Sequence, residues 1–240
     1  MKPTQGGGGG RAAAIALNRL ITQEESPEGL LCLVEEELGN LNDMNVATAF
    51  SKLGKLCSSR SFPRNVAAND RFRGLTVLAR DMCADGRRQE QVVASITHAV
   101  GKMSAAGKLA ADDADVQDTL AALEGRVVLV ASHMNPQNVS NTAYAFAALG
   151  RMPGAETRAA LEAAVVRVTP DPDVKPQAVT NVTWAFATLG WELGAEVRAA
   201  LKAAVVRVAV RMNPQAVTNA AWSFATLGWE PGAEARAALE

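Results

Sequence analysis

An asparagine and, three residues later, an aromatic residue recur in this chain in the pairs Asn141 and Tyr144, Asn181 and Trp184, and Asn219 and Trp222. A planar ring offers a face on which a nucleic-acid base stacks, and an Asn or Gln amide hydrogen-bonds the edges of bases. These residue types at one spacing therefore form a candidate surface for a single-stranded nucleic acid.

Both residue types also have a structural interpretation. The ring packs against the next repeat of a stack, and the base-stacking and packing interpretations of the rings both stay open. The asparagine amide bonds a backbone carbonyl and fixes the register of adjacent helices, and we favour this role over base reading. His98 falls at the ring position of a weaker copy of the pattern.

The pairs lie in a segment that repeats. Residues 213–228 match residues 175–190 almost letter for letter, residues 135–150 are a third copy, and fainter copies cover 45–54 and 91–104. The anchor residues of the five copies are Asn45, Ser95, Asn141, Asn181 and Asn219. Their separations of 50, 46, 40 and 38 residues are typical of helix-pair repeats.

Each copy is predicted to form two helices. In the last copy Asn213 serves as N-cap, Pro214 lies in the first turn and Gly228 ends the helix in a left-handed conformation. Trp191 and Trp229 directly follow closing glycines, where a residue contacts the preceding turn. The second helix covers residues such as 194–208, whose valine-rich end resembles a strand but whose alanine-rich turns favour a helix.

The fold class that follows is all-α, an α-solenoid of helix-pair repeats of about 38–50 residues. We divide the chain into a flexible Gly-rich N-terminal segment at 1–25, degenerate helical repeats with loop insertions at 26–134, and three regular repeats at 135–240. Upstream, we expect a helix from Pro27 to Gly39. The last repeat stops within its second helix, so the chain is expected to be part of a longer protein.

A projection of the first helices at about 100° per residue separates an apolar arc from a polar arc that holds the ring. The candidate binding residues on the polar arcs are Gln137, Asn141, Tyr144, Gln177, Asn181, Trp184, Thr188, Gln215, Asn219, Trp222, Ser223 and Thr226. Arg158 and Arg198, early in the second helices, are candidate phosphate contacts. An arginine with an acid four residues on, such as Glu162, is more often on a solvated helix face.

Charge and composition limit the function classes. The chain has 24 Lys and Arg against 25 Asp and Glu, and the balance holds in each of the segments 1–60, 61–125 and 126–240. A nucleic acid must therefore be held by a local arrangement of groups. Apolar runs fall short of the roughly 20 residues of a membrane span, so we expect a soluble chain without a membrane partner.

Signals of catalysis are missing from the sequence. The glycine run at 6–10 lacks the residues of a phosphate loop, and His98 and His133 have no Cys or acid at metal-ligand spacing. We therefore expect no catalytic residue, no metal, no cofactor and no small-molecule substrate.

The stretch from Pro214 to Gly228, Pro-Gln-Ala-Val-Thr-Asn-Ala-Ala-Trp-Ser-Phe-Ala-Thr-Leu-Gly, resembles the Pro-Gln-x-x-x-Asn-x-x-Trp-Ala-x-Ala-x-Leu-Gly motif of octotricopeptide-like repeat proteins of algae and protists. Those proteins are similar to FAST-kinase-like organellar RNA-binding proteins and to the repeat domain of the kinetoplastid RNA-editing substrate-binding complex. The resemblance is specific over residues 135–240 and looser over 40–134.

The resemblance implies a non-catalytic α-solenoid that binds single-stranded organellar RNA and governs its processing, stability or translation. It also implies residence in a chloroplast or mitochondrion and partners among organellar RNA-processing proteins. The first copy departs from the motif because Thr48 stands at the ring position, and the Ser95 copy lacks the asparagine. The alternative is a protein-interaction scaffold of the HEAT or armadillo kind, which the balanced charge favours, whereas the rings within a polar stripe favour RNA.

Overall fold

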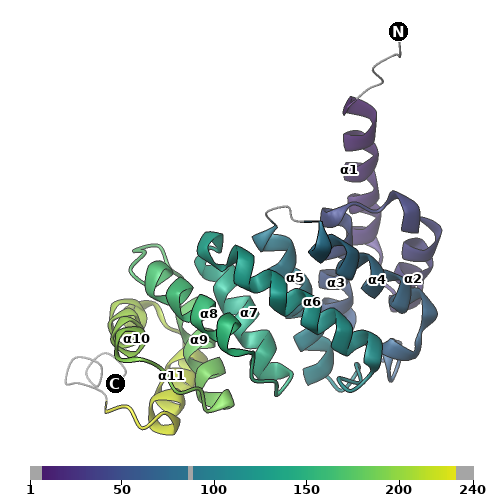
Figure 1. Cartoon of the computed structure of the whole chain (residues 1–240). Coiled ribbons are helices and arrows are strands. Elements are labelled where there is room, and N and C mark those ends of the chain that lie inside the picture. Colours follow the sequence, from purple (N-terminus) through teal and green to yellow (C-terminus); the bar gives the residue numbers. More distant parts are fainter. Residues whose placement is uncertain (1–6, 86–88, 231–240) are drawn as a thin grey trace.

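The computed structural model describes residues 7–85 and 89–230, which form eleven α-helices, four short 3₁₀ turns and no β-strand (Figure 1). The helices are α1 (Gly7–Gln23), α2 (Pro27–Glu36), α3 (Asp43–Leu56), α4 (Asp70–Ala84), α5 (Glu90–Ala105), α6 (Ala114–Val130), α7 (Pro136–Ala148), α8 (Ala155–Val168), α9 (Pro176–Leu189), α10 (Ala195–Val208) and α11 (Pro214–Thr226). The 3₁₀ turns are η1 (Leu38–Asn40), η2 (Val66–Ala68), η3 (Ala131–His133) and η4 (Ala209–Arg211). The all-α prediction is confirmed, including helices over the valine-rich segments.

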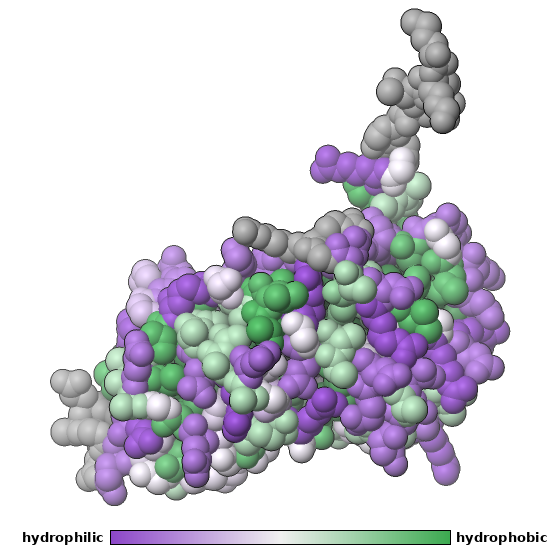
Figure 2. Space-filling model, in the orientation of Figure 1, coloured by the Kyte–Doolittle hydropathy of each residue, from purple (hydrophilic) through white to green (hydrophobic). Residues whose placement is uncertain are grey.

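The helices pack in two rows. The A row runs α1, α3, α5, α7, α9 and α11, each helix packing on the next, and the B row runs α2, α4, α6, α8 and α10 in the same way. Contacts such as α5 with α6 and α7 with α8 join the rows. The chain is therefore an α-solenoid of helix pairs. In the orientation of Figure 1, hydrophilic residues cover most of the right-hand edge and the lower right, and separate hydrophobic patches lie at the upper right near α2 and α4 and nearer the middle (Figure 2).

The ends of the A-row helices follow the predicted capping pattern. The side chains of Asn135 and Asn213 each accept a backbone N–H at 2.8 Å. Gly150, Gly190 and Gly228 close α7, α9 and α11 with φ angles of 61°, 60° and 63°, in the left-handed region that glycine adopts at a helix end.

Two buried tryptophans pack against the ends of the A-row helices that they follow. The ring of Trp191 lies 4.5 Å from that of Phe186, and the ring of Trp229 lies 5.5 Å from that of Phe224. The Nε1–H of Trp191 also donates to Glu162 of α8 at 2.8 Å. The predicted contact with the preceding turn is confirmed, and Trp191 additionally links α9 to the B row.

Small residues let the A-row helices approach closely. A Cβ added at Gly101 of α5 would lie 2.7 Å from the Cα of Ala145 in α7. Ala185 of α9 and Ser223 of α11 occupy the position of Ala145 in their own helices, and both are fully buried. This column of small side chains sets the spacing of the A row.

The N-terminal segment differs from the prediction. The glycine run predicts a flexible segment at 1–25, but α1 covers Gly7–Gln23, and its Leu17 and Ile21 are buried in the core. Packing of this apolar face compensates for the low helix propensity of the glycines. Residues 1–6 lie outside the described ranges, as does the truncated last helix expected within 231–240.

The end of α2 also differs from the prediction. The helix ends at Glu36, and Gly39, the expected closing residue, lies in the turn η1. Gly39 is not among the glycines with positive φ, so it does not form the left-handed helix end that closes the later repeats.

Candidate nucleic-acid interface

Four positions recur along one stripe of the A-row helices. They are the second, sixth, ninth and thirteenth residues after the N-cap, a spacing of four, three and four that keeps them on one helix face. The members are Gln91, Ser95, His98 and Lys102 in α5, Gln137, Asn141, Tyr144 and Ala148 in α7, Gln177, Asn181, Trp184 and Thr188 in α9, and Gln215, Asn219, Trp222 and Thr226 in α11. All are half-buried or exposed. We call this set the amide–ring surface.

The helix starts correct the alignment of the first copy. Asn45 is the third residue after its N-cap Asn42, whereas Asn181 is the sixth residue after its own N-cap, Lys175. The residue of α3 that is equivalent to Asn181 is therefore Thr48, and Ser51 takes the ring position that the motif assigns to Thr48. An alignment on a single asparagine carries no information about where the helix begins. The predicted alignment of α3 is therefore displaced by three residues, nearly one helical turn.

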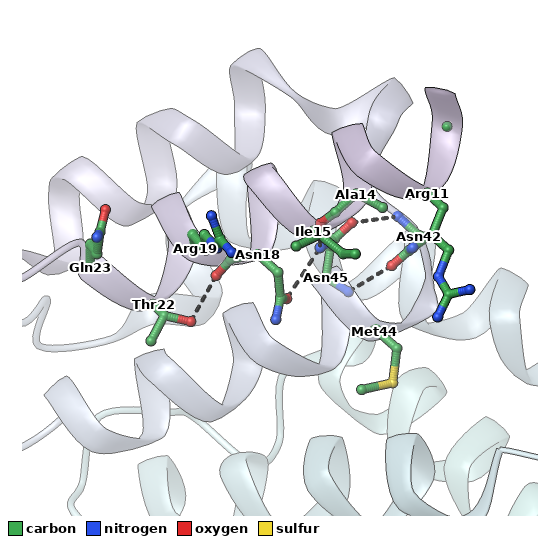
Figure 3. Close-up of a pocket in the computed structure, with 11 residues that line it drawn as sticks. Arg11, Ala14, Ile15, Asn18, Arg19, Thr22, Gln23, Asn42, Met44 and Asn45 are labelled. Atoms are coloured by element: carbon green, nitrogen blue, oxygen red, sulfur yellow. Dashed lines mark hydrogen bonds between the residues drawn. The ribbon is translucent and has the colours of Figure 1, made fainter. Parts of the chain in front are cut away.

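Asn45 fixes the register of two helices. It is buried, and its Nδ2–H donates to the Ala14 carbonyl at 3.0 Å and to the Asn18 side chain at 3.1 Å, both in α1 (Figure 3). Its Oδ1 accepts the backbone N–H of Asn42 at 3.2 Å. The structural role that we favour for the asparagines is confirmed at this position.

The asparagines of the regular repeats make different contacts. Asn141 accepts a hydrogen bond from Gln137 of its own helix at 2.8 Å. In the described part of the chain, no hydrogen bond involves the side chain of Asn181 or Asn219. Each of these half-buried amides keeps its donors and acceptors available to a ligand.

The rings pack against one another. The His98 and Tyr144 centroids lie 5.3 Å apart, and Tyr144 and Trp184 stack at 5.5 Å with an angle of 29° between their planes. At that distance no base fits between Tyr144 and Trp184 unless the rings separate. Trp222, in α11 at the end of the A row, is 46% exposed. The packing interpretation therefore fits Tyr144 and Trp184, and Trp222 is the most open ring.

His98, the ring residue of α5 on the amide–ring surface, is a neutral side chain. Burial lowers the pKa of His98, the nearby Lys102 charge lowers it further, and a hydrogen bond with the Asn141 backbone opposes the shift. The imidazole is therefore uncharged at neutral pH. Its Nδ1 has no hydrogen-bond partner among the described residues.

Three predicted site residues lie away from this surface. Ser223 is fully buried, and its hydroxyl donates to the Asn219 carbonyl at 2.6 Å, because it occupies the small-residue column between A-row helices. Arg158 and Arg198 lie on α8 and α10 in the B row. A helical projection describes one helix at a time. It therefore gives no information on whether the arginines of the second helix face the same side of the molecule as the rings of the first.

A polar pocket includes two cations that the motif analysis did not single out. It has a volume of about 410 Å³ and lies between the N-terminal ends of α9 and α11. Its lining includes Lys175, Arg211, Gln177, Asn181, Gln215 and Asn219. Lys175 stands at the N-cap, where the neighbouring repeats have Asn135 and Asn213, and this departure from the repeat is the sequence signal that could have identified it.

A second, larger pocket lies at the other end of the A row. It has a volume of about 700 Å³ and lies between α1 and α3, with Ile15 and Met44 beside Arg11 and Arg19 (Figure 3). Met44 is the second residue after its N-cap, so it replaces the glutamine of the later helices. In α3 the first position of the stripe is therefore apolar, and Thr48 and Ser51 stand where the later helices have an amide and a ring.

The two rows differ in charge. The described A-row helices hold five basic and two acidic residues, whereas the B-row helices hold nine basic and eleven acidic ones. Because the rows alternate along the chain, a balance taken over consecutive segments does not show this difference. The five basic residues of the A row lie in α1, α3 and α5, whereas α7, α9 and α11 hold no charged residue. On a chain with a net charge of −1, the A row is therefore positive only toward its N-terminal end.

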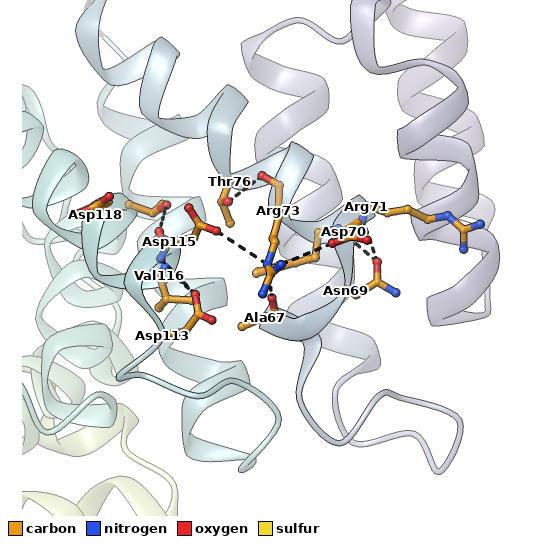
Figure 4. Close-up of polar contacts among 12 residues, drawn as sticks. Ala67, Asn69, Asp70, Arg71, Arg73, Thr76, Asp113, Asp115, Val116 and Asp118 are labelled. Atoms are coloured by element: carbon orange, nitrogen blue, oxygen red, sulfur yellow. Dashed lines mark hydrogen bonds and ion pairs between the residues drawn. The ribbon is translucent and has the colours of Figure 1, made fainter.

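Several B-row arginines are paired with carboxylates. Arg71 of α4 forms ion pairs with Glu28 and Glu35 of α2. The Nε of Arg73, also in α4, lies 3.7 Å from a carboxylate oxygen of Asp115 in α6 (Figure 4). Exposed pairs of this kind contribute about 0–1 kcal/mol each. They reduce the positive charge that α4 could offer to a phosphate.

Hydrogen bonding and stacking are the chemistry that the amide–ring surface offers. Within residues 7–85 and 89–230, no cluster of three His, Cys, Asp or Glu side chains could hold a metal ion. Burial raises the pKa of Cys83 to about 11, so this thiol stays protonated near neutral pH. None of the described helices has both the length and the apolarity to cross a membrane.

The fold and the surface define an α-solenoid whose A row exposes amides and rings at one register. The sequence matches none of the protein-family models compared with it, and no curated protein is significantly similar to it. The resemblance to octotricopeptide-like repeat proteins is therefore a resemblance of the sequence motif alone.

Proposed function

We propose that the chain is a non-catalytic helical-repeat protein that binds single-stranded RNA and acts in the processing, stability or translation of organellar transcripts. The observation that carries the proposal is the amide–ring surface, with Gln, Asn and a ring at the same register of α7, α9 and α11. Unstacked bases are recognised through amide hydrogen bonds to their edges and through stacking on aromatic faces. The motif resemblance supplies the expectation of a chloroplast or mitochondrion.

The contacts of the rings favour the amides as the main recognition groups. Because Tyr144 and Trp184 stack on each other, they hold α7 and α9 at a fixed separation. The unbonded amide of Asn181 is therefore presented by a helix whose position relative to α7 is fixed, which reduces the entropic cost of binding. The basic residues of α1, α3 and α5, toward the N-terminal end of the A row, attract the phosphates of the same strand.

The alternative is a protein-interaction scaffold. The stacking of Tyr144 on Trp184 favours it, because rings that pack on each other do not offer the faces between them to a base. Free amides also hydrogen-bond the main chain of an extended peptide. The excess of basic residues in α1, α3 and α5 favours RNA, and the same binding experiment separates the two functions.

The test compares the amides of one row with the arginines of the other. We expect the double variant Asn181→Ala, Asn219→Ala to bind a short single-stranded RNA of random sequence about 5- to 150-fold more weakly. Each substitution removes one hydrogen bond to the RNA, and each bond contributes about 0.5–1.5 kcal/mol. The double variant Arg158→Gln, Arg198→Gln is the control and should keep wild-type affinity. Fluorescence anisotropy measures both.

An equal loss from both double variants contradicts the proposed surface. If the wild-type chain binds no RNA at low salt but binds extended peptides, the scaffold replaces the RNA-binding proposal.

A further inference from the structure

The pocket between α9 and α11 combines cations and amides without a carboxylate in its lining. Lys175 and Arg211 supply the charges, and Gln177, Asn181, Gln215 and Asn219 supply the amides. We propose that this pocket binds a phosphate group of the backbone of a single-stranded RNA. The inference rests on the proposed function and assigns one contact point of the strand.

Lys175 is unusual for its position in the repeat. Asn135 and Asn213, at the same position of α7 and α11, cap their helices with a hydrogen bond of 2.8 Å, whereas Lys175 makes no side-chain cap bond. An ammonium group has no acceptor and cannot cap an N-terminus. The residue gives up local stability and adds a positive charge to the pocket, which is typical of a functional position.

Arg211 is oriented by the repeat before it. Its guanidinium donates to the Val174 carbonyl at 3.1 Å and to the Pro172 carbonyl at 3.4 Å. Carbonyl partners hold the group in place without neutralising its charge, and the remaining N–H groups suit the oxygens of a phosphate.

The acids of the same loop lie outside the pocket. Asp171 and Asp173 are not part of its lining, and Asp171 accepts the backbone N–H of Asp173 at 2.9 Å. No ion pair of Lys175 or Arg211 occurs within the described ranges. The positive charge of the pocket is therefore available to an anion.

The pocket adjoins the amide–ring surface. Its volume of about 410 Å³ lies in the range of about 300–1,000 Å³ that is typical of ligand sites. Asn219 lines the pocket and stands three residues before Trp222 on the same helix. A nucleotide with its phosphate in the pocket therefore has its base within reach of the most open ring.

The test uses Lys175→Asn, which restores the capping residue of the neighbouring repeats. We expect the melting temperature to rise, because the cap bond forms, while affinity for a random single-stranded RNA falls. The slope of log affinity against log salt should become shallower by roughly 0.7–1. Arg211→Gln should give the same change in slope, and Arg198→Gln in the B row is the matched control.

The outcomes separate this inference from the proposed function. A more stable Lys175→Asn variant with weaker binding and a shallower slope supports the phosphate site. If that variant and Arg211→Gln bind RNA with wild-type affinity and slope, the phosphate site is wrong and the RNA-binding proposal stands. If the wild-type chain binds no RNA, the proposed function fails and this inference fails with it.

Discussion

At the scale of single residues, position along a helix decides what an asparagine does. Asn45, three residues after its N-cap, is buried and joins α3 to α1. Asn181 and Asn219, six residues after theirs, are half-buried on the amide–ring surface. Three residues add about 300° at about 100° per residue, so the two positions differ by about 60° around the helix and by nearly one turn along it.

Trp184 and Trp222 should likewise differ in their roles. Trp184→Ala removes a ring that stacks on Tyr144, so we expect the free energy of unfolding to fall by about 2–3 kcal/mol, less than for a fully buried ring. Trp222→Ala removes a ring that is 46% exposed. It should change stability by less than about 1 kcal/mol and weaken RNA binding by about 1–3 kcal/mol.

Urea unfolding followed by circular dichroism and RNA binding followed by anisotropy measure the two quantities. The account of the rings is wrong if Trp222→Ala destabilises the fold more than Trp184→Ala, or if Trp222→Ala leaves RNA affinity unchanged.

Among the candidate residues, the sequence predicts those that depend on the helical period. Gln177, Asn181 and Trp184 share one stripe because their spacing of four and three residues is set by the helix itself. Ser223 was misplaced because the projection gives a direction but not how closely α9 approaches α11. Lys175 and Arg211 were not singled out because their proximity depends on how two repeats stack, which no single repeat encodes.

At the scale of elements, local chemistry predicted the regular repeats well. Prolines in the first turn and closing glycines such as Gly190 mark the ends of α7, α9 and α11, and the structure has these ends. The N-terminal helix α1 was not predicted, because the glycines there argue for flexibility and the packing of Leu17 and Ile21 is a tertiary effect.

The close contact of α5 with α7 gives a prediction for the A row. In Gly101→Ala, the new methyl would meet the backbone of Ala145 at 2.7 Å, so we expect a loss of about 1–2 kcal/mol, because overpacking outweighs the gain in helix propensity. Gly125 of α6 has no atom within 4 Å of an added Cβ. Gly125→Ala is the matched control and should stabilise by up to about 1 kcal/mol.

Thermal or urea unfolding of the two variants provides the measurement. Equal stabilisation by both substitutions would mean that α5 and α7 are farther apart than the structure has them.

At the scale of the whole molecule, the two rows carry different kinds of side chain. The B row pairs arginines of α4 with acids. The A row carries its basic residues in α1, α3 and α5 and its regular amides and rings in α7, α9 and α11. A solenoid suits this division because each added helix pair extends both rows and lengthens the same surface. The central claim is that single-stranded RNA lies along the A row.

Ultraviolet crosslinking of the purified chain to a short single-stranded RNA, followed by mass spectrometry of the crosslinked peptides, tests that claim most directly. We predict crosslinks to peptides of α9 and α11, with Trp222 among the crosslinked residues, because the open ring and the free amides lie there. Crosslinks confined to α8 and α10 would place RNA on the B row and contradict the account. An absence of crosslinks under conditions in which a known RNA-binding protein gives them would contradict it as well.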